Sequence, residues 1–580
     1  MIDEALEVFK KIYDKEGEKL VVNKHIPKDG TYILVNIKSG KIIEKLNIFY
    51  DKKAKKIDGE LNQYYGYFRA FDYYSNLVDM NKPMDPKKTI HSNQIYSFFI
   101  KKDSIRENKL TKSIIEGYKK NLLNPEEKYN SKEAKELYKN IAEKLPKIEK
   151  DIVEDIFLWI EDNVNENLLD NDNKKDYLKI FFVEDNLDKS LELFKNEHKR
   201  YLIPNIFNSN DYNKKVEESI YGASNNNMGL NPKKVFLLNR TRKIGSSYLI
   251  HIREALLQYA FYNYLLSEAK NENNFIYFFE NEIISRTYKE SCPNGAKYLL
   301  NITYFKDKIK EVAKIKNFNV ISKDSNKDIS INFKEILHQK KKDTDEIEYG
   351  NLNREKMMNN INKILFYNSL LGNFLLNDGD LDIKDIEVKK LLMKYRNSFY
   401  KWFYLNDEAE VKKNIRKIYL DAVMVAIGNG HFFKASQQLD FGFCLEKYFY
   451  GKSELMEEIM NVKEVFLNHT LSEEEWEFLN DEEYFFAVGQ ILAYINYMRN
   501  SKAKSLNFIK QLTFVKNIDV LKEKIKKIVI SYSHIFETKN KKINRTVSNI
   551  SLYQPKEIRI DILLAGFTAD IIFFKKREEK

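Results

Sequence analysis

The sequence predicts an α+β protein in which a mixed α/β N-terminal region is followed by an all-α C-terminal helical bundle. Apolar residues make up 43% and aromatic residues 13% of the 580 residues, enough to form sizeable cores. Segments with the two-residue alternation of strands concentrate in the first 345 residues, whereas apolar residues later recur every three or four positions, as in helices. At about 150 residues per domain, this length predicts two to four domains.

The N-terminal region mixes both periods. Residues 5–20 have helical spacing, and residues 31–37 and 43–50 alternate like two strands joined by the turn Ser39-Gly40. Further strands are predicted over residues 95–100, 233–238, 275–279 and 320–333, and long helices over residues 131–169 and 174–198.

The C-terminal region has helical spacing nearly throughout. Ser472 and Glu475 match a capping box, which predicts a helix start at Ser472. The polar run 339–351 is the best boundary, so we expect domains at 1–345 and 346–580. Helices are predicted over residues 357–375, 386–404, 410–427, 432–449 and 484–500.

The positive charge is concentrated at one end of the chain. The formal net charge is +11, but residues 481–580 hold 19 Lys/Arg against 11 Asp/Glu, a net +8. The other 480 residues are nearly neutral at +3. The whole-chain charge is therefore too mild to indicate nucleic-acid binding, and only the C-terminal end favours a phosphate-facing surface.

Several classes of protein are excluded or disfavoured. Two cysteines cannot form a disulfide framework or an all-cysteine zinc site, and the eight histidines lack metal-ligand spacing. The sequence has no P-loop, no Gly-x-Ser-x-Gly elbow and no His-Glu-x-x-His motif. The acidic N-terminus does not resemble a secretory signal, and the most apolar stretch, 560–574, is too short to span a bilayer. We therefore expect a cytoplasmic protein without a cofactor, a metal or an enzymatic activity.

Two segments offer weak alternatives. The run from Asp378 to Asp382 resembles the start of a calcium loop, but Ile383 stands where the sharp turn requires glycine, so an acidic surface turn is favoured. Cys292 precedes Pro293-Asn294-Gly295 and can be read as a nucleophile, although a turn cysteine is the simpler interpretation.

A Gly/Asn-rich loop over residues 221–234 is the most unusual segment. It leads into a short apolar run and then a basic cluster at 239–243. Asparagine amides can meet the edges of base pairs, and nearby lysines and arginines can neutralise phosphates. The alternative is an ordinary loop in a chain that is rich in Asn, Lys and Ile throughout.

The basic C-terminal stretch also permits two interpretations. Its lysines can face phosphates or simply solvent, and its aromatic residues can stack on bases or form a packed helix face, which is the simpler reading. The aromatic residues are Tyr484, Phe485, Phe486, Tyr494, Tyr497 and Phe508.

Three sequence blocks, in order along the chain, resemble the large subunit of the type I-B CRISPR effector complex, the Csh family of Cascade proteins. The first block comprises residues 72–75, 81–88 and 91–93, and the second is the segment 227–234 with Thr241-Arg242-Lys243. The third block comprises residues 486–490, 501–504 and 564–567. Some family members carry a cysteine-based zinc site, which two cysteines cannot provide in a four-cysteine form here.

The resemblance implies a non-catalytic subunit of an RNA-guided surveillance complex. Such a subunit recognises the protospacer-adjacent motif (PAM) on duplex DNA, helps to unwind it, stabilises the R-loop and recruits a helicase-nuclease for antiviral defence. The implied partners are a guide CRISPR RNA, target double-stranded DNA, the Cascade backbone and handle-binding subunits, and small subunits. The resemblance also implies that the C-terminal bundle corresponds to a small subunit, for which Met424, Met456 or Met460 could be an internal start. Ordinary core or surface methionines are the simpler interpretation of each of the three.

The resemblance assigns nucleic-acid contacts to the loop and its basic cluster, and the positive charge of the C-terminal stretch adds phosphate contacts there. The assigned residues are Asn225, Asn226, Asn227, Lys233, Lys234, Arg240, Arg242, Lys243, Lys502, Lys504 and Lys510. A free-standing DNA- or RNA-binding protein, and a nuclease or transferase with a dispersed active site, remain as alternatives.

Overall fold

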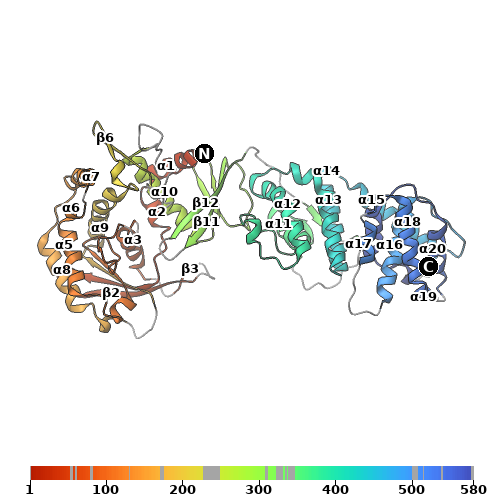
Figure 1. Ribbon diagram of the computed structural model, residues 1–580, viewed down its shortest axis with the longest axis horizontal. Coiled ribbons are helices and arrows are strands. Elements are labelled where there is room, and N and C mark those ends of the chain that lie inside the picture. The colour runs from red at the N-terminus through yellow and green to blue at the C-terminus, as the bar shows by residue number, and fades with distance from the viewer. Residues whose placement is uncertain are drawn as a thin grey trace. The chain divides into compact units, whose positions relative to one another are not determined.

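The protein forms two compact units, as seen in a computed structural model (Figure 1). The N-terminal unit comprises Met1–Thr287 and Lys297–Asn319, and the C-terminal unit comprises Tyr288–Ala296 and Val320–Lys580. The structure describes residues 2–51, 56–58, 62–78, 82–129, 131–169, 175–225, 249–306, 311–321, 331–333, 336–337, 347–499, 507–513, 515–536 and 540–575.

The predicted fold class is confirmed. Helices hold 56% of the residues and strands 15%, with the main sheets in the N-terminal unit and a succession of helices in the C-terminal unit. The units divide between residues 319 and 320, whereas the sequence predicted a division between 345 and 346. The difference arises because strand β13 (Ile331–Phe333) pairs with β14 (Gly350–Leu352) and packs against helix α14 (Phe432–Tyr450) of the C-terminal unit.

A five-stranded sheet forms the centre of the N-terminal unit, in the order β3-β2-β1-β5-β4. The predicted hairpin is present as β1 and β2, which pair antiparallel, and every residue of β1 is buried. β1 also pairs in parallel with β5, so that Gly30 lies opposite Tyr177. The strands are β1 (Gly30–Asn36), β2 (Ile42–Asp51), β3 (Lys56–Asp58), β4 (Ser97–Lys101) and β5 (Tyr177–Val183).

The helix predicted over residues 174–198 is wrong in its first half. The segment Tyr177–Val183 is strand β5, and helix α9 (Leu187–Leu202) begins only after Asn186, whose side chain accepts hydrogen bonds from the N–H groups of Asp188 and Lys189. β5 is nearly continuously apolar because it is buried between β1 and β4. Lys179, the only lysine of the strand, interrupts its apolar run, and the resulting pattern of polar and apolar residues resembles that of a helix.

A second sheet of four strands, in the order β10-β9-β11-β12, contacts the long helix α10 (Ile252–Lys270). These strands are β9 (Phe275–Phe278), β10 (Ile283–Arg286), β11 (Tyr298–Lys306) and β12 (Glu311–Val320). A smaller sheet comprises β6 (Lys214–Val216), β7 (Ser219–Gly222) and β8 (Ile250–His251). Of the predicted strand 320–333, only the two ends are strands in the described chain, and the predicted strand 233–238 lies outside the described residues.

The helices of the N-terminal unit pack around these sheets. Residues from both larger sheets and from helices α1, α3, α8 and α10 share one hydrophobic core. The helices preceding α9 are α1 (Ile2–Glu16), α2 (Lys19–Val22), α3 (Tyr65–Ser75), α4 (Lys102–Arg106), α5 (Lys112–Leu123), α6 (Pro125–Lys128), α7 (Lys132–Ala142) and α8 (Lys150–Asn163).

The C-terminal unit is a succession of helices, in which α13 and α14 lie side by side (Figure 1). Its helices besides α14 are α11 (Arg354–Asn360), α12 (Ile386–Leu405), α13 (Ala409–Gly428), α15 (Glu454–Leu471), α16 (Asp481–Met498), α17 (Asn507–Thr513), α18 (Ile518–Ser531), α19 (Ser533–Phe536), α20 (Lys541–Leu552) and α21 (Ile560–Thr568). The helix predicted over 357–375 ends early, since α11 continues as a π-helical turn only to Leu365.

The predicted helix start at Ser472 is wrong. Ser472 ends α15, with its N–H donating to the carbonyl of Asn468 at 3.0 Å. Helix α16 begins instead after Asn480, whose side-chain oxygen accepts from the N–H of Glu483, while the carboxylate of Glu483 accepts from the N–H of Leu479. The cap therefore keeps the three-residue spacing of a capping box but lies eight residues further along.

Most of the aromatic residues of α16 belong to the core. Tyr484, Phe485, Phe486 and Tyr494 are at most 4% exposed, so they are unavailable for stacking on bases. Tyr497 is 63% exposed, and the side chain of Phe508 lies outside the described residues. The packed helix face was therefore the correct interpretation of this spacing.

A buried histidine makes the stability of the N-terminal unit depend on pH. His198 on α9 is 3% exposed, and its Nδ1–H donates to the carbonyl of Tyr74 at 2.9 Å. Burial lowers the pKa of His198 to about 4, from its ordinary value of 6.5. As the pH falls below 6.5, His198 therefore binds a proton in the unfolded chain before it does so in the folded protein. Stability from this group is thus complete above pH 6.5, and about 3 kcal/mol is lost by pH 4.

The measurement is hydrogen exchange of the α9 amides between pH 7 and 4, corrected for intrinsic exchange rates. His198→Gln keeps a donor for the Tyr74 carbonyl but cannot titrate, and it should flatten the pH dependence. An equally steep dependence in this variant would show that other groups cause the loss.

Candidate functional site

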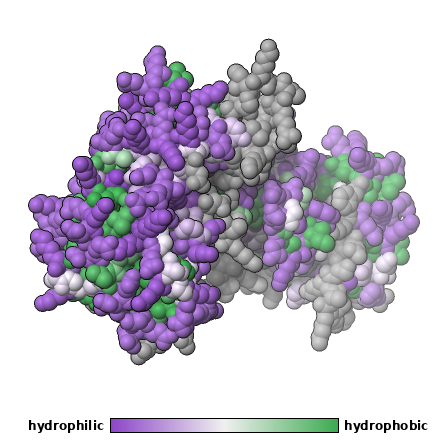
Figure 2. Space-filling view, turned by 60° about the vertical axis from the view of Figure 1, so that its left-hand side comes forward, coloured by the Kyte–Doolittle hydropathy of each residue, from purple (hydrophilic) through white to green (hydrophobic). Residues whose placement is uncertain are grey.

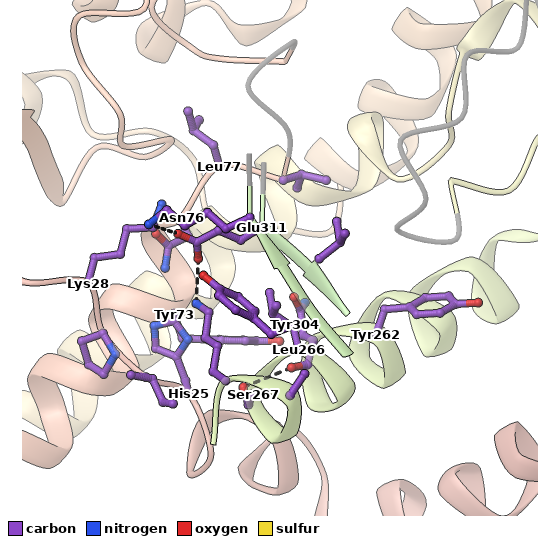
Figure 3. Close-up of a pocket in the computed structure, with 18 of the residues that line it drawn as sticks. His25, Lys28, Tyr73, Asn76, Leu77, Tyr262, Leu266, Ser267, Tyr304 and Glu311 are labelled. Atoms are coloured by element: carbon purple, nitrogen blue, oxygen red, sulfur yellow. Dashed lines mark hydrogen bonds and ion pairs between the residues drawn. The ribbon is translucent and has the colours of Figure 1, made fainter. Parts of the chain in front are cut away.

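A pocket of about 1240 Å³ lies within the N-terminal unit, between its two larger sheets (Figure 3). One side consists of the segment 25–29, which leads into β1, together with the C-terminal end of α3 and the first residues of β5. The other side consists of α10, the C-terminal end of β11 and the N-terminal end of β12. The parallel pairing of β1 and β5 brings Gly30 beside Tyr177 and so fixes the first side.

The lining of this pocket is basic. It includes seven lysines and four carboxylates, a formal net charge of +3. The lysines are Lys28, Lys88, Lys101, Lys175, Lys179, Lys270 and Lys306, and the carboxylates are Asp29, Asp176, Glu272 and Glu311. A concave surface of this charge concentrates anions, and low-dielectric walls strengthen the attraction.

Three lysines surround the carboxylate of Glu311. Its oxygens lie 2.9 Å from the Nζ of Lys270 and 3.0 Å from the Nζ of Lys306. Burial raises the pKa of Glu311, but Lys270 and Lys28 outweigh this effect and hold it at about 2, so the group is ionised at neutral pH. The four side chains together carry a net charge of +2.

A buried ionic network forms part of the pocket wall, since His25 and Lys179 line the pocket. The Asp72 carboxylate is fully buried, contacts the Nζ of Lys179, and lies 2.7 Å from the Nε2 of His25. Burial raises the pKa of Asp72, yet Lys179 and His25 hold it well below its ordinary value. Burial lowers the pKa of Lys179 to about 8, against the opposing effect of Asp72.

The network fixes the pocket wall. The side-chain amide of Asn76 donates to the carbonyl and the carboxylate of Asp72, at 2.7 and 3.2 Å, which anchors the chain after α3. The Lys179 ammonium lies 4.7 Å from the ring centre of Phe99 and 5.0 Å from that of Tyr32. Since Lys179 is satisfied within the wall, it supports the pocket's shape and does not offer its charge to a ligand.

His91 is neutral at physiological pH. Burial lowers its pKa to about 4. Its Nε2–H donates to the carbonyl of Lys88 at 3.0 Å, so its Nδ1 accepts from the Tyr177 hydroxyl, also at 3.0 Å. The histidine therefore positions Tyr177 at the start of β5.

Of the residues predicted to bind nucleic acid, Asn225 lines this pocket. Lys510 is part of α17, but its side chain lies outside the described residues. Also outside them are Asn226, Asn227, Lys233, Lys234, Arg240, Arg242, Lys243, Lys502 and Lys504.

The first and third sequence blocks have different structural roles. Tyr73, Lys88 and His91 of the first block line the pocket. The described parts of the third block, 486–490 and 564–567, join two helices. Gly489 on α16 and Gly566 on α21 bring the backbones together, and the amide of Gln490 donates to the carbonyl of Gly566 at 2.6 Å. The first block therefore marks a site, whereas the third marks helix packing.

Sequence reasoning missed Lys28, Lys270, Lys306 and Glu311. Each is a single charged residue near the end of a different strand or helix, without a local motif. Only the first block could have indicated the position of the pocket, because it contains Asp72 and three of the residues that line the pocket.

Figure 2 shows mostly hydrophilic side chains on this face of the N-terminal unit, with smaller hydrophobic areas between them. Over the described ranges, no group of three or more His, Cys, Asp or Glu side chains is arranged to hold a metal ion. Asp378, from the calcium-like run, pairs with the guanidinium of Arg396, and Cys292 is buried.

None of the helices that the structure describes is long and apolar enough to cross a membrane. Comparison with known proteins adds no relative: no family model, no curated protein and no solved structure matches the chain.

Proposed function

We propose that this chain is the non-catalytic large subunit of a type I-B CRISPR surveillance complex. In this role it recognises the protospacer-adjacent motif on duplex DNA, helps to unwind the duplex and stabilises the R-loop. It then recruits the helicase-nuclease. The proposal starts from the three ordered sequence blocks.

One structural observation supports it above the others. Residues of the first block and Asn225, at the start of the Gly/Asn-rich loop, line the same basic pocket although about 130 residues separate them in sequence. A pocket with excess lysine suits the phosphates of a nucleic acid.

The chemistry divides recognition between RNA and protein. Base pairing with the guide reads the target sequence, and the protein reads only a short flanking motif and the backbone. Asparagine amides of the loop would contact base edges, while lysines of the pocket and of the basic C-terminal stretch would contact phosphates. The position of Asn225 in the lining supports this division, because the loop would then begin near lysines that could contact phosphates.

Purification of the tagged full chain from its native cells tests the proposal against its alternatives. We expect a multi-subunit complex that holds short RNA of uniform length. Heterogeneous RNA, or none, would instead indicate a free-standing nucleic-acid-binding protein. Metal-dependent cleavage by the isolated chain would indicate a nuclease and overturn the non-catalytic assignment.

Replacing Asn225, Asn226 and Asn227 together with alanine should weaken discrimination between correct and mutated flanking motifs. The loss should be about 1–3 kcal/mol for each base contact removed, because good contacts to base edges discriminate by that amount. The measurement compares the affinity of the assembled complex for the two duplexes. Asn167→Ala, an exposed asparagine that does not line the pocket, is the control. Unchanged discrimination in a fully assembled complex would remove the loop from motif reading.

A further inference from the structure

The pocket of the N-terminal unit combines two kinds of surface that a single nucleotide requires. One end is the lysine cluster around Glu311, and beside it stands the exposed ring of Tyr304 (Figure 3). The volume of about 1240 Å³ exceeds that of ordinary small-molecule sites, so the pocket has room for a nucleotide and the adjoining backbone of its strand.

Among the three lysines around Glu311, Lys28 is the one that is placed to meet a ligand. Its side chain is exposed to the solvent of the pocket, yet the surrounding protein lowers the pKa of its ammonium. Lys270 and Lys306 share the Glu311 carboxylate, whereas Lys28 makes no ion pair with any residue in the described part of the chain. A phosphate beside Lys28 would therefore enter a site with net charge +2 and form a direct ion pair with its ammonium.

Tyr304 offers an aromatic surface close to the same point. It is 39% exposed, and its ring makes no stacking contact with the other described residues. Figure 3 shows the ring beside Glu311, with the Lys28 side chain pointing toward the same carboxylate from the opposite side. A base stacked on Tyr304 would place its own phosphate within reach of Lys28.

Three of the side-chain amides that line the pocket are already hydrogen-bonded within the protein. Asn76 donates to Asp72, Gln258 donates to Glu254 and accepts from Ser224, and Asn274 donates to the carbonyl of Ile302. Asn225 and Asn263 also line the pocket, but the surfaces around Glu311 and Tyr304 are charged and aromatic. At that end stacking and charge dominate, and such binding tolerates any base.

We propose that this pocket holds one unpaired nucleotide of a nucleic-acid strand, with its phosphate on Lys28 and its base stacked on Tyr304. This inference rests on the proposed function, because the nucleotide would belong to the guide or to a target strand. It assigns the pocket to holding a splayed-out nucleotide without reading its identity, which is distinct from the motif reading assigned to the loop.

The test is binding of a fluorescent single-stranded oligonucleotide of about ten residues to the full chain, followed by anisotropy. Lys28→Gln should weaken binding roughly fivefold to tenfold and reduce the salt dependence by about one counterion. Tyr304→Leu should weaken it roughly tenfold with an unchanged salt dependence, whereas Tyr304→Phe, which keeps the ring, should bind normally. Lys41→Gln, with the same charge change at the opposite end of β1, should have no effect.

Competitors define the ligand. An abasic oligonucleotide should compete more weakly than one with bases, and oligonucleotides of different single bases should compete equally. Wild-type affinity in Lys28→Gln or Tyr304→Leu would overturn the proposal. It would also be overturned if adenosine monophosphate or a polyglutamate peptide competed as well as the oligonucleotide. Because the isolated chain is used, such a failure leaves the native complex and its uniform RNA as a separate test of the proposed function.

Discussion

Replacing Asp72 with asparagine is expected to destabilise the N-terminal unit by about 3–5 kcal/mol at pH 6. Asp72 is fully buried, and its carboxylate faces both Lys179 and His25. The variant leaves the Lys179 ammonium buried without its anionic partner, which costs far more than the loss of an exposed ion pair.

The loss should shrink as the pH rises from 6 to 9. In the folded protein burial has already lowered the pKa of Lys179 to about 8, below the 10.5 of the unfolded chain, and losing Asp72 lowers it further. The stability of each protein rises with pH once its folded form has lost the Lys179 proton that the unfolded chain still binds. This rise begins at a lower pH in the variant than in the wild type, so the difference in stability between them shrinks.

Hydrogen exchange of the β1 and β5 amides, analysed by mass spectrometry, measures this loss without interference from the other unit. Asp14→Asn is the matched control, since Asp14 forms an exposed ion pair with Lys10 on α1 and should cost less than 1 kcal/mol. A loss that is small, or constant between pH 6 and 9, would contradict the role of the buried network.

Replacing Gly489 with alanine is expected to destabilise the C-terminal unit by about 3 kcal/mol. The added Cβ would lie 2.3 Å from the carbonyl oxygen of Leu563 and 2.6 Å from the backbone nitrogen of Phe567. Both obstacles are backbone atoms of α21, so no rotamer change relieves the clash, and α16 and α21 must move apart. This cost exceeds the gain of about 1 kcal/mol in helix propensity.

The matched control is Gly372→Ala in the same unit, where an added Cβ meets nothing within 4 Å. Exchange of the α16 and α21 amides should accelerate strongly in Gly489→Ala and remain unchanged in the control. Equal exchange in the two variants would show that the helices tolerate separation, and that the third sequence block has a role other than packing.

The parts of the fold that follow local patterns were predictable. The alternation over residues 31–37 and 43–50 predicted β1 and β2, and the three-and-four spacing predicted α12, α13 and α14 within a residue or two of their observed ends. These elements are predictable because one periodic face of each is buried, and the sequence records that face directly.

The pocket could not be derived in the same way. The strand β5 was hidden because Lys179 interrupts its apolar run, and a lysine is tolerated there only because Asp72, 107 residues earlier, pairs with it. Lys28, Lys270 and Glu311 likewise meet only through the packing of α10 and the two sheets. Such a site depends on tertiary structure, whereas the loop and the first block could be recognised as motifs.

The central claim is that the chain recognises a flanking motif within an RNA-guided complex. It is tested most directly by reconstituting the complex with guide RNA and selecting from duplexes that carry the guide's target beside a randomised flanking sequence. We expect enrichment of one short motif, only when the guide matches the target, and loss of that enrichment in the Asn225, Asn226 and Asn227 alanine variant. Binding without enrichment of a motif, or equal enrichment without the guide, would contradict it.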